Sequence, residues 1–173
     1  MEIRQITELL QLIDEPNRSA CYKLFKDNKI RFYKSPGSLT KHQAWEGGYI
    51  HHLEEAMSFA IAQYKLMDDF RKQEFSLSDL LLVLFLHDLE KPWRYVDPKT
   101  VFSSDEQKND FIREMAEKYG IVLTADHLNG LKYIHGEGKD YSRTKRIAGP
   151  LATVAHVCDD ISARVWFDYP KKR

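Results

Sequence analysis

Apolar residues recur along most of this chain with the three-to-four-residue spacing of an α-helix. Strand-like alternation is confined to residues 29–38, where Pro36 and Gly37 interrupt it, so we expect an extended connection there. The pattern therefore predicts an all-α fold. With the residues that commonly start and stop helices, it predicts helices over residues 3–14, 17–27, 49–69, 76–88, 103–120, 124–135 and 150–167.

Several of these segments have recognisable boundaries. Ser76 is followed three residues later by Asp79, a pairing typical of a helix start. The segment DEQKNDFIREMAEKYG begins with acids and ends with a lysine and a glycine, which suits the helix dipole and a left-handed final turn. No repeat or low-complexity tract divides the chain. We expect one domain over residues 1–173, with N-terminal helices and a connection in 1–40 and the site core in 41–167.

Composition mainly excludes classes of partner. The 173 residues include 26 basic and 26 acidic side chains, so no overall field favours long nucleic acid or an anionic membrane. The N-terminus lacks a signal-peptide pattern and no apolar run reaches about 18 residues, which predicts a cytoplasmic protein. Cys21 and Cys158 do not form a metal-binding pair, and we expect both to be core thiols.

The most apolar segment of the chain ends in two ionisable residues. His87 and Asp88 directly follow the run LLLVLFL, which is apolar on every side and indicates a buried helix. A buried carboxylate without a partner costs several kcal/mol, so Asp88 is expected to be paired, hydrogen-bonded or bound to a metal.

Helical angles distinguish neighbouring polar residues in GGYIHH. His51 shares an arc with Glu55 and Ser58, which we interpret as the solvent face of the helix. His52 shares an arc with Ala56 and is expected to turn inward. Only the second histidine is therefore a candidate for a buried site.

The tandem acids near the C-terminus divide in the same way. Asp159 flanks the apolar stripe of its helix, whereas Asp160 lies on the far side, four residues before Arg164, where an exposed ion pair is expected. The polar groups directed inward are His52, His87, Asp88 and Asp159. Two imidazoles and two carboxylates suit one or two divalent transition metals such as Mn, Fe, Ni, Co or Zn. A buried hydrogen-bonded network without a metal is the alternative.

The order of these motifs resembles a known family. GGYIHH is similar to the Gly-Gly-x-x-x-His helix start, LFLHDLEK to the apolar-His-Asp-x-x-Lys signature, and HVCDDISA to the His-Val-Ala-Asp-x-x-Ser-Ala ending of the HD-domain metal-dependent phosphohydrolase superfamily. The resemblance covers about residues 41–163. It implies a compact single-domain, HD-domain-like bundle of about six or seven helices. The metal ligands that it implies are His52, His87, Asp88 and Asp159.

The same resemblance implies roles for further residues. Some members bind a second metal through two more histidines, which nominates His127 and His135, although eight residues rise about 12 Å and cannot place both on one ion. Lys91 would offset charge on a phosphate, Asp88 or Asp159 would orient the water, and His135 or His42 would protonate the leaving oxygen. His42 would contact the substrate or donate a proton. Other candidate substrate contacts are Lys41, Trp93 and Arg94, with Arg31.

The function implied is hydrolysis of a nucleotide or another small phosphate ester by a metal-activated water. Two alternatives stay open. An HD-fold di-iron oxygenase would need both His127 and His135 to face the site. A non-catalytic nucleotide-binding or regulatory module would keep the metal without turnover, and Glu90, which stands where many members have glycine, favours that alternative.

Overall fold

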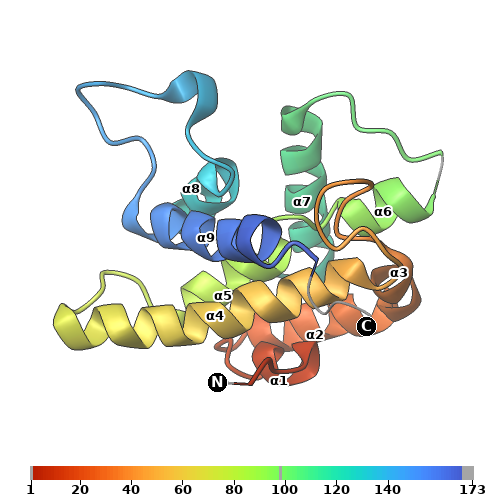
Figure 1. The fold of residues 1–173 in the computed structure, drawn as a ribbon, viewed down its shortest axis with the longest axis horizontal. Helices are drawn as coiled ribbons and strands as arrows, with labels where there is room; N and C mark the ends of the chain where they lie inside the picture. Colours follow the sequence, from red (N-terminus) through yellow and green to blue (C-terminus); the bar gives the residue numbers. More distant parts are fainter. Residues whose placement is uncertain (1, 98, 169–173) are drawn as a thin grey trace.

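The computed structural model describes residues 2–97 and 99–168, and every regular element in this part of the chain is helical (Figure 1). The prediction of an all-α fold is confirmed. The α-helices, in chain order, are α1 Ile6–Leu10, α2 Asn17–Asp27, α3 Lys29–Lys34, α4 Gly48–Phe70, α5 Leu77–Leu86, α6 Lys91–Val96, α7 Asp105–Tyr119, α8 Ala125–Tyr133 and α9 Pro150–Asp160. A 3-10 turn spans Gly138–Asp140, and α9 continues as a π-helical turn, Ile161–Val165.

Local sequence signals explain the ends of the principal helices. α5 begins with the expected capping box, in which the Asp79 backbone N–H donates to Ser76 Oγ at 3.1 Å and the Ser76 N–H donates to Asp79 Oδ2 at 2.8 Å. α7 ends at Gly120, whose φ of 74° permits the left-handed final turn. These boundaries agree with the predicted ones.

The expectation of an extended connection after α2 is wrong, because residues 29–34 form α3. Phe32 in this helix is fully buried, and its ring packs edge-on against Phe25 and Tyr49 at centroid distances of 5.7 and 5.3 Å. Burial of this aromatic side chain outweighs the β-like composition of the segment.

A further helix, α6, was not expected after the His87-Asp88 pair. Pro92 lies in its first turn, where the N–H that proline lacks would have no intrahelical partner, so the residue suits the start of this helix, while α5 already ends at Leu86. With α3 and α6, the bundle contains more than the roughly six or seven helices expected.

The helices that carry the candidate site residues pack at the centre of the molecule. α5 contacts α4, α8 and α9, and its apolar residues from Leu80 to Leu86 are at most 1% exposed. In Figure 1, α4 spans the width of the molecule, α9 crosses above it, and α1 and α2 lie below. The described helices share one hydrophobic core and form a single domain. No helix among the described residues combines the length and apolar character needed to cross a bilayer.

The loop between α3 and α4 lies unusually close to the start of α4. A Cβ on Gly48 would lie 1.8 Å from the carbonyl oxygen of Gln43, so only glycine permits this approach. Gln43 is fully buried with a φ of 38°, a left-handed conformation that is uncommon for residues other than glycine. Its backbone N–H donates to the carbonyl of Phe167 at 2.6 Å, which fixes the loop to the end of the C-terminal helical segment.

Candidate metal centre

Three helical segments bring the four predicted ligands together in the core. His52 comes from α4, His87 and Asp88 follow the last turn of α5, and Asp159 lies near the end of α9. All four are buried, and one ligand atom from each lies within 4.8 Å of the others. The two helical-angle choices are thus confirmed, because His52 and Asp159 turn inward and Asp160 pairs with Arg164 at 2.8 Å.

The ring nitrogens and carboxylate oxygens face one another at short range. His52 Nε2 lies 3.3 Å from His87 Nε2 and 3.1 Å from Asp159 Oδ1. His87 Nε2 lies 3.1 Å from Asp88 Oδ2. These distances describe four electron-rich groups that converge on one small volume.

The second nitrogen of each ring determines which tautomer faces the cluster. His87 Nδ1 lies 2.7 Å from the carbonyl oxygen of Leu84, which can only accept, so Nδ1 carries the proton. Neutral His87 therefore presents the Nε2 lone pair to the cluster, the form in which histidine binds a metal.

His52 is held by a longer chain of hydrogen bonds. Ser162 Oγ donates to Glu55 Oε2 at 2.7 Å, so the hydroxyl oxygen is free to accept from His52 Nδ1 at 3.0 Å. Gln43 Nε2 also donates to Glu55 Oε2 at 2.9 Å. This arrangement gives neutral His52 the same tautomer as His87, with its Nε2 lone pair toward the cluster.

The electrostatics of the cluster favour a cation. Burial disfavours the charged form of His87, but the carboxylates of Asp88 and Asp159 outweigh it and raise its pKa to about 10. Burial lowers the pKa of His52, so near neutral pH His52 is neutral and, of the two rings, only His87 is an imidazolium. Burial also opposes the ionisation of Asp88 and Asp159. Lys91 and His87 nevertheless hold the pKa of Asp88 well below its usual range, and His52 and His87 do the same for Asp159.

The donor set fits a divalent transition metal. Metal binding requires both rings to be neutral, and in these tautomers their Nε2 lone pairs lie 3.3 Å apart, where one ion can accept both. Asp88 Oδ2 is buried and makes no hydrogen bond of good geometry, although Lys91 Nζ and His87 Nε2 lie close to it. Two nitrogen and two carboxylate ligands suit Mn, Fe, Ni, Co or Zn, and one ion would satisfy all four.

A cavity of about 410 Å³ opens beside the cluster. Of the residues predicted to contact substrate or to act in catalysis, Lys41, His42, Lys91 and His135 all line it. The remaining lining residues are Asp88, Asp159, Asp160, Ala163 and Arg164. The cavity thus joins the candidate metal ligands to a set of basic side chains.

His135 lies at the edge of the cluster. Its Nε2 is 3.7 Å from Asp88 Oδ1 and 3.6 Å from Asp159 Oδ2, and its side chain is 60% exposed. The structure therefore brings this residue to the mouth of the site.

His127, the other candidate for a second metal, requires a correction. Its Nδ1 accepts from the Thr124 backbone N–H at 3.0 Å, and its Nε2 donates to Asp79 Oδ1 at 2.9 Å. Both ring nitrogens are engaged in the start of α8 and its contact with α5. A second metal position formed by His127 and His135 is therefore not supported.

Trp93 and Arg94 do not line the cavity and are corrected as candidate substrate contacts. Trp93 packs on Phe111 at a centroid distance of 5.2 Å, and the guanidinium of Arg31 lies 5.3 Å from the Trp93 ring centre. Arg94 lies over the ring of Tyr95. The first of these contacts joins α6 to α7, the second joins α3 to α6, and the third lies within α6.

Sequence reasoning missed Glu55 and Ser58 as interior residues. Both are buried, because α1 and the segment after α9 cover the face of α4 that we expected to meet solvent. The backbone N–H of Arg4 donates to Ser58 Oγ at 2.9 Å. The available signal for the hydrogen-bonded chain was Ser162, which matches the serine of the family's final motif.

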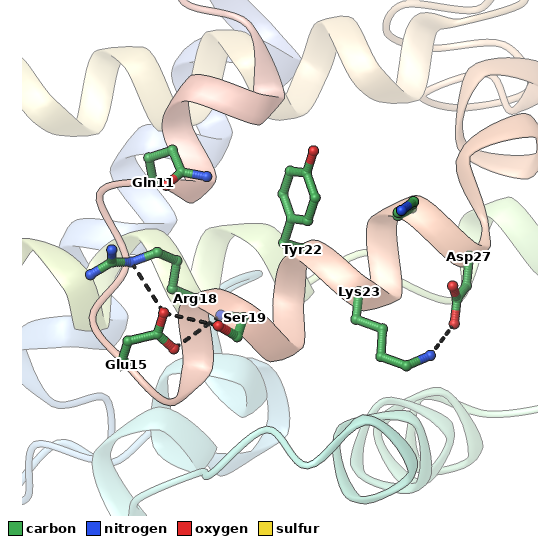
Figure 2. A pocket seen from close by; sticks show the side chains of 8 residues that line it. Gln11, Glu15, Arg18, Ser19, Tyr22, Lys23 and Asp27 are labelled. Carbon is green, nitrogen blue, oxygen red and sulfur yellow. Dashed lines mark hydrogen bonds and ion pairs between the residues drawn. The ribbon is translucent and has the colours of Figure 1, made fainter.

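A second hollow, on the outer face of α2, has a different character (Figure 2). There Arg18 lies 3.8 Å from Glu15, and Lys23 pairs with Asp27 at 2.5 Å. These charged groups are substantially exposed and already paired, so the hollow lacks the buried convergent ligands of the cluster.

The chain matches no protein-family model, and no curated protein or solved structure is significantly similar to it. The helical fold and the His/Asp cluster are compatible with an HD-like fold, although no match confirms that family.

Proposed function

We propose that this protein is a metal-dependent phosphohydrolase that acts on a nucleotide or another small phosphate ester. The observation that carries the proposal is the junction of the buried four-ligand cluster with a cavity lined by basic side chains. A divalent ion in such a site polarises phosphoryl oxygens and lowers the pKa of a bound water to near neutrality.

Charge balance in the cavity supports a phosphate substrate. The cations Lys41, Lys91 and Arg164 are matched by the carboxylates of Asp88, Asp159 and Asp160. A divalent ion would leave this cavity with a net positive charge, which suits a phosphate ester and disfavours a cationic or neutral substrate. The modest volume of about 410 Å³ favours a small molecule.

Lys91 is the best placed of the three cations. It lines the cavity and its Nζ contacts Asp88 Oδ2. Burial disfavours its charged form, but the Asp88 carboxylate outweighs burial and raises the pKa of Lys91. Lys91 therefore stays cationic and would offset charge that develops on the phosphate.

Asp88 and His135 would divide the proton transfers. Asp88 can orient a water through its other oxygen, Oδ1, which faces His135 at the edge of the cluster. His135, at the mouth beside both carboxylates, is positioned to exchange a proton with the leaving oxygen. The di-iron oxygenase alternative loses support, because His127 is bound to Asp79.

Elemental analysis of purified protein tests the metal part of this proposal. Wild type reconstituted separately with Mn, Fe, Ni, Co and Zn should retain about one ion per chain. Asp159→Asn should retain none, and Asp160→Asn, the outward neighbour on the same helix, should retain metal as wild type does. A wild type that binds none of the five metals would overturn the proposal.

Phosphate release from a panel of nucleotides and sugar phosphates tests the catalytic part. Metal-loaded wild type should turn over at least one ester, and Lys91→Gln should lower kcat/KM by roughly 10- to 1000-fold while keeping the metal. Tight nucleotide binding without turnover would instead support the non-catalytic module.

A further inference from the structure

His42 has a defined hydrogen-bonding state, which follows from its neighbour in the α3–α4 loop. His42 Nδ1 lies 2.7 Å from the side-chain amide oxygen of Gln43, Oε1. The His42 ring lines the cavity, and its centroid lies 4.9 Å from that of His52. The state of the remaining nitrogen, Nε2, therefore bears directly on what the cavity recognises.

The orientation of the Gln43 amide is set by its surroundings. The end assigned as Nε2 lies 2.9 Å from Glu55 Oε2, 3.2 Å from the Ser162 carbonyl oxygen and 3.4 Å from the Trp166 carbonyl oxygen. Carbonyl groups only accept hydrogen bonds, so the donating nitrogen must face them. The amide oxygen is thereby turned toward His42.

An amide oxygen accepts only, so His42 Nδ1 must carry the proton and donate it to Gln43. Neutral His42 then holds a lone pair on Nε2. An acid was one of the two roles expected of His42, and a neutral ring with only an acceptor in the cavity does not suit it.

The backbone around this pair is specialised. Gln43 adopts a left-handed φ of 38° although it is not glycine. At position 48 only glycine fits beside the carbonyl oxygen of Gln43. Such conformations persist only where surrounding contacts hold them, and they cluster at functional sites. The loop therefore holds the His42 ring in one orientation at the cavity.

We infer that His42 is a specificity-determining residue, which accepts a hydrogen bond from a hydroxyl group on the substrate close to its phosphate. This inference rests on the proposed phosphohydrolase function. It assigns the substrate class as phosphate esters of polyols, sugars or ribonucleosides, and it disfavours esters that lack a hydroxyl near the phosphate.

The placement of His42 limits where that hydroxyl lies. Its ring is in van der Waals range of His52, one of the four candidate ligands, so the acceptor stands next to the region where a phosphate would bind. Lys41 and Lys91, which line the same cavity, supply charge but no acceptor. His42 thus places a neutral acceptor beside the lysines of the cavity.

Matched ester pairs test the inference. Metal-loaded wild type is assayed with glycerol 1-phosphate against propyl phosphate, and with a ribonucleoside 5′-monophosphate against its 2′,3′-dideoxy analogue. We expect kcat/KM to favour the hydroxylated ester by roughly 10- to 100-fold in the pair that is turned over. His42→Phe should abolish the preference by lowering activity on the hydroxylated ester alone.

Lys41→Gln is the matched control from the same loop. It should lower kcat/KM for both members of a pair equally and so preserve their ratio. Two results would overturn the inference: a wild type without preference, or a His42→Phe variant that loses activity on both esters to the same extent. The second result would assign His42 to the chemistry or to the fold.

The tautomer of His42 is measured separately from catalysis. Imidazole ¹⁵N NMR of zinc-loaded and metal-free protein at neutral pH should show His42 neutral and protonated on Nδ1, with the signal assigned by its loss in His42→Phe. An Nε2-protonated ring would overturn the inference even if the protein hydrolyses phosphate esters. If no ester is turned over, calorimetric binding of the same pairs replaces kcat/KM, and equal binding of both members overturns it.

Discussion

Two of the buried histidines, His52 and His127, contact aspartate at similar distances, and only His52 has the chemistry of a metal site. His52 Nε2 lies 3.1 Å from Asp159 Oδ1, and His127 Nε2 lies 2.9 Å from Asp79 Oδ1. His127 accepts through Nδ1 from the Thr124 N–H, so its Nε2 carries the proton and donates it to Asp79. His52 has the opposite tautomer, because its Nδ1 is the donor.

The difference shows that a histidine–carboxylate contact does not by itself indicate a metal. The partner of the other ring nitrogen decides whether a lone pair is available. At His127 a backbone N–H uses that lone pair, and the contact completes a helix cap. At His52 and His87 the outer partners are a hydroxyl and a carbonyl, and both lone pairs converge on the two carboxylates.

The largest expected effect comes from removing a histidine of the metal cluster, and removal of His127 serves as the comparison. His87→Gln removes a metal ligand and should weaken metal binding by more than about 100-fold. Loss of a residue that only hydrogen-bonds to a ligand typically costs about 10- to 100-fold. His127→Gln should bind metal as wild type does. Calorimetric titration with Zn or Mn measures both, and a loss of affinity in the His127 variant would contradict the comparison.

Metal addition should raise the free energy of unfolding by binding to the four-ligand cluster and not to the His127–Asp79 pair. At a free metal concentration about 100 times Kd, wild type gains about 2.7 kcal/mol, which raises Tm by roughly 5–10 °C for a chain of this size. A chelator should reverse the shift. Asp159→Asn should show no shift in thermal unfolding, and a shift equal to that of wild type would mean that the metal binds elsewhere.

A smaller effect is expected from the outer partner of His52. Ser162→Ala removes the acceptor that fixes the tautomer and should weaken metal affinity by roughly 10- to 100-fold. Ser58→Ala provides a control, because Ser58 is also a buried serine whose hydroxyl accepts from a backbone N–H, that of Arg4. Equal metal affinity in the two variants, both shown to be folded by circular dichroism, would argue against the proposed role of Ser162.

The smallest effect concerns pH and the capping region. Burial opposes the ionisation of Asp79, but hydrogen bonds from Ser76 and His127 outweigh it and lower its pKa below the usual 3.8. A depressed folded-state pKa contributes stability that is present above pH 3.8 and is lost as the pH falls below it. Urea unfolding of Asp79→Asn should therefore show a weaker loss of stability below that pH than wild type. Parallel curves would show that Asp79 contributes nothing.

Much of the candidate site was predictable because helical periodicity is a local property. A rotation of 100° per residue places adjacent residues on different faces, which selected His52 and Asp159 from their pairs. The unbroken apolar run likewise indicated that His87 and Asp88 follow a buried helix. These predictions needed no knowledge of which helices meet.

Periodicity was insufficient where a second helix replaces solvent. The face of α4 with Glu55 and Ser58 has the polar pattern of an exposed surface, yet α1 and the segment after α9 cover it. A polar side chain satisfied by another helix and one satisfied by water have the same sequence pattern. Local pattern also could not predict α3, which depends on the burial of Phe32 among aromatic rings from other segments.

By itself, the sequence determined the helical class, the principal helix boundaries and the four residues that turn inward, because each depends on neighbours within a few turns. Tertiary structure alone decided that His135 lies beside the cluster and that His127 pairs with Asp79. It also decided the ring tautomers, through contacts such as that of Ser162 with His52, 110 residues apart. A tautomer depends on the partner of one nitrogen atom, and that partner is known only once the helices are packed.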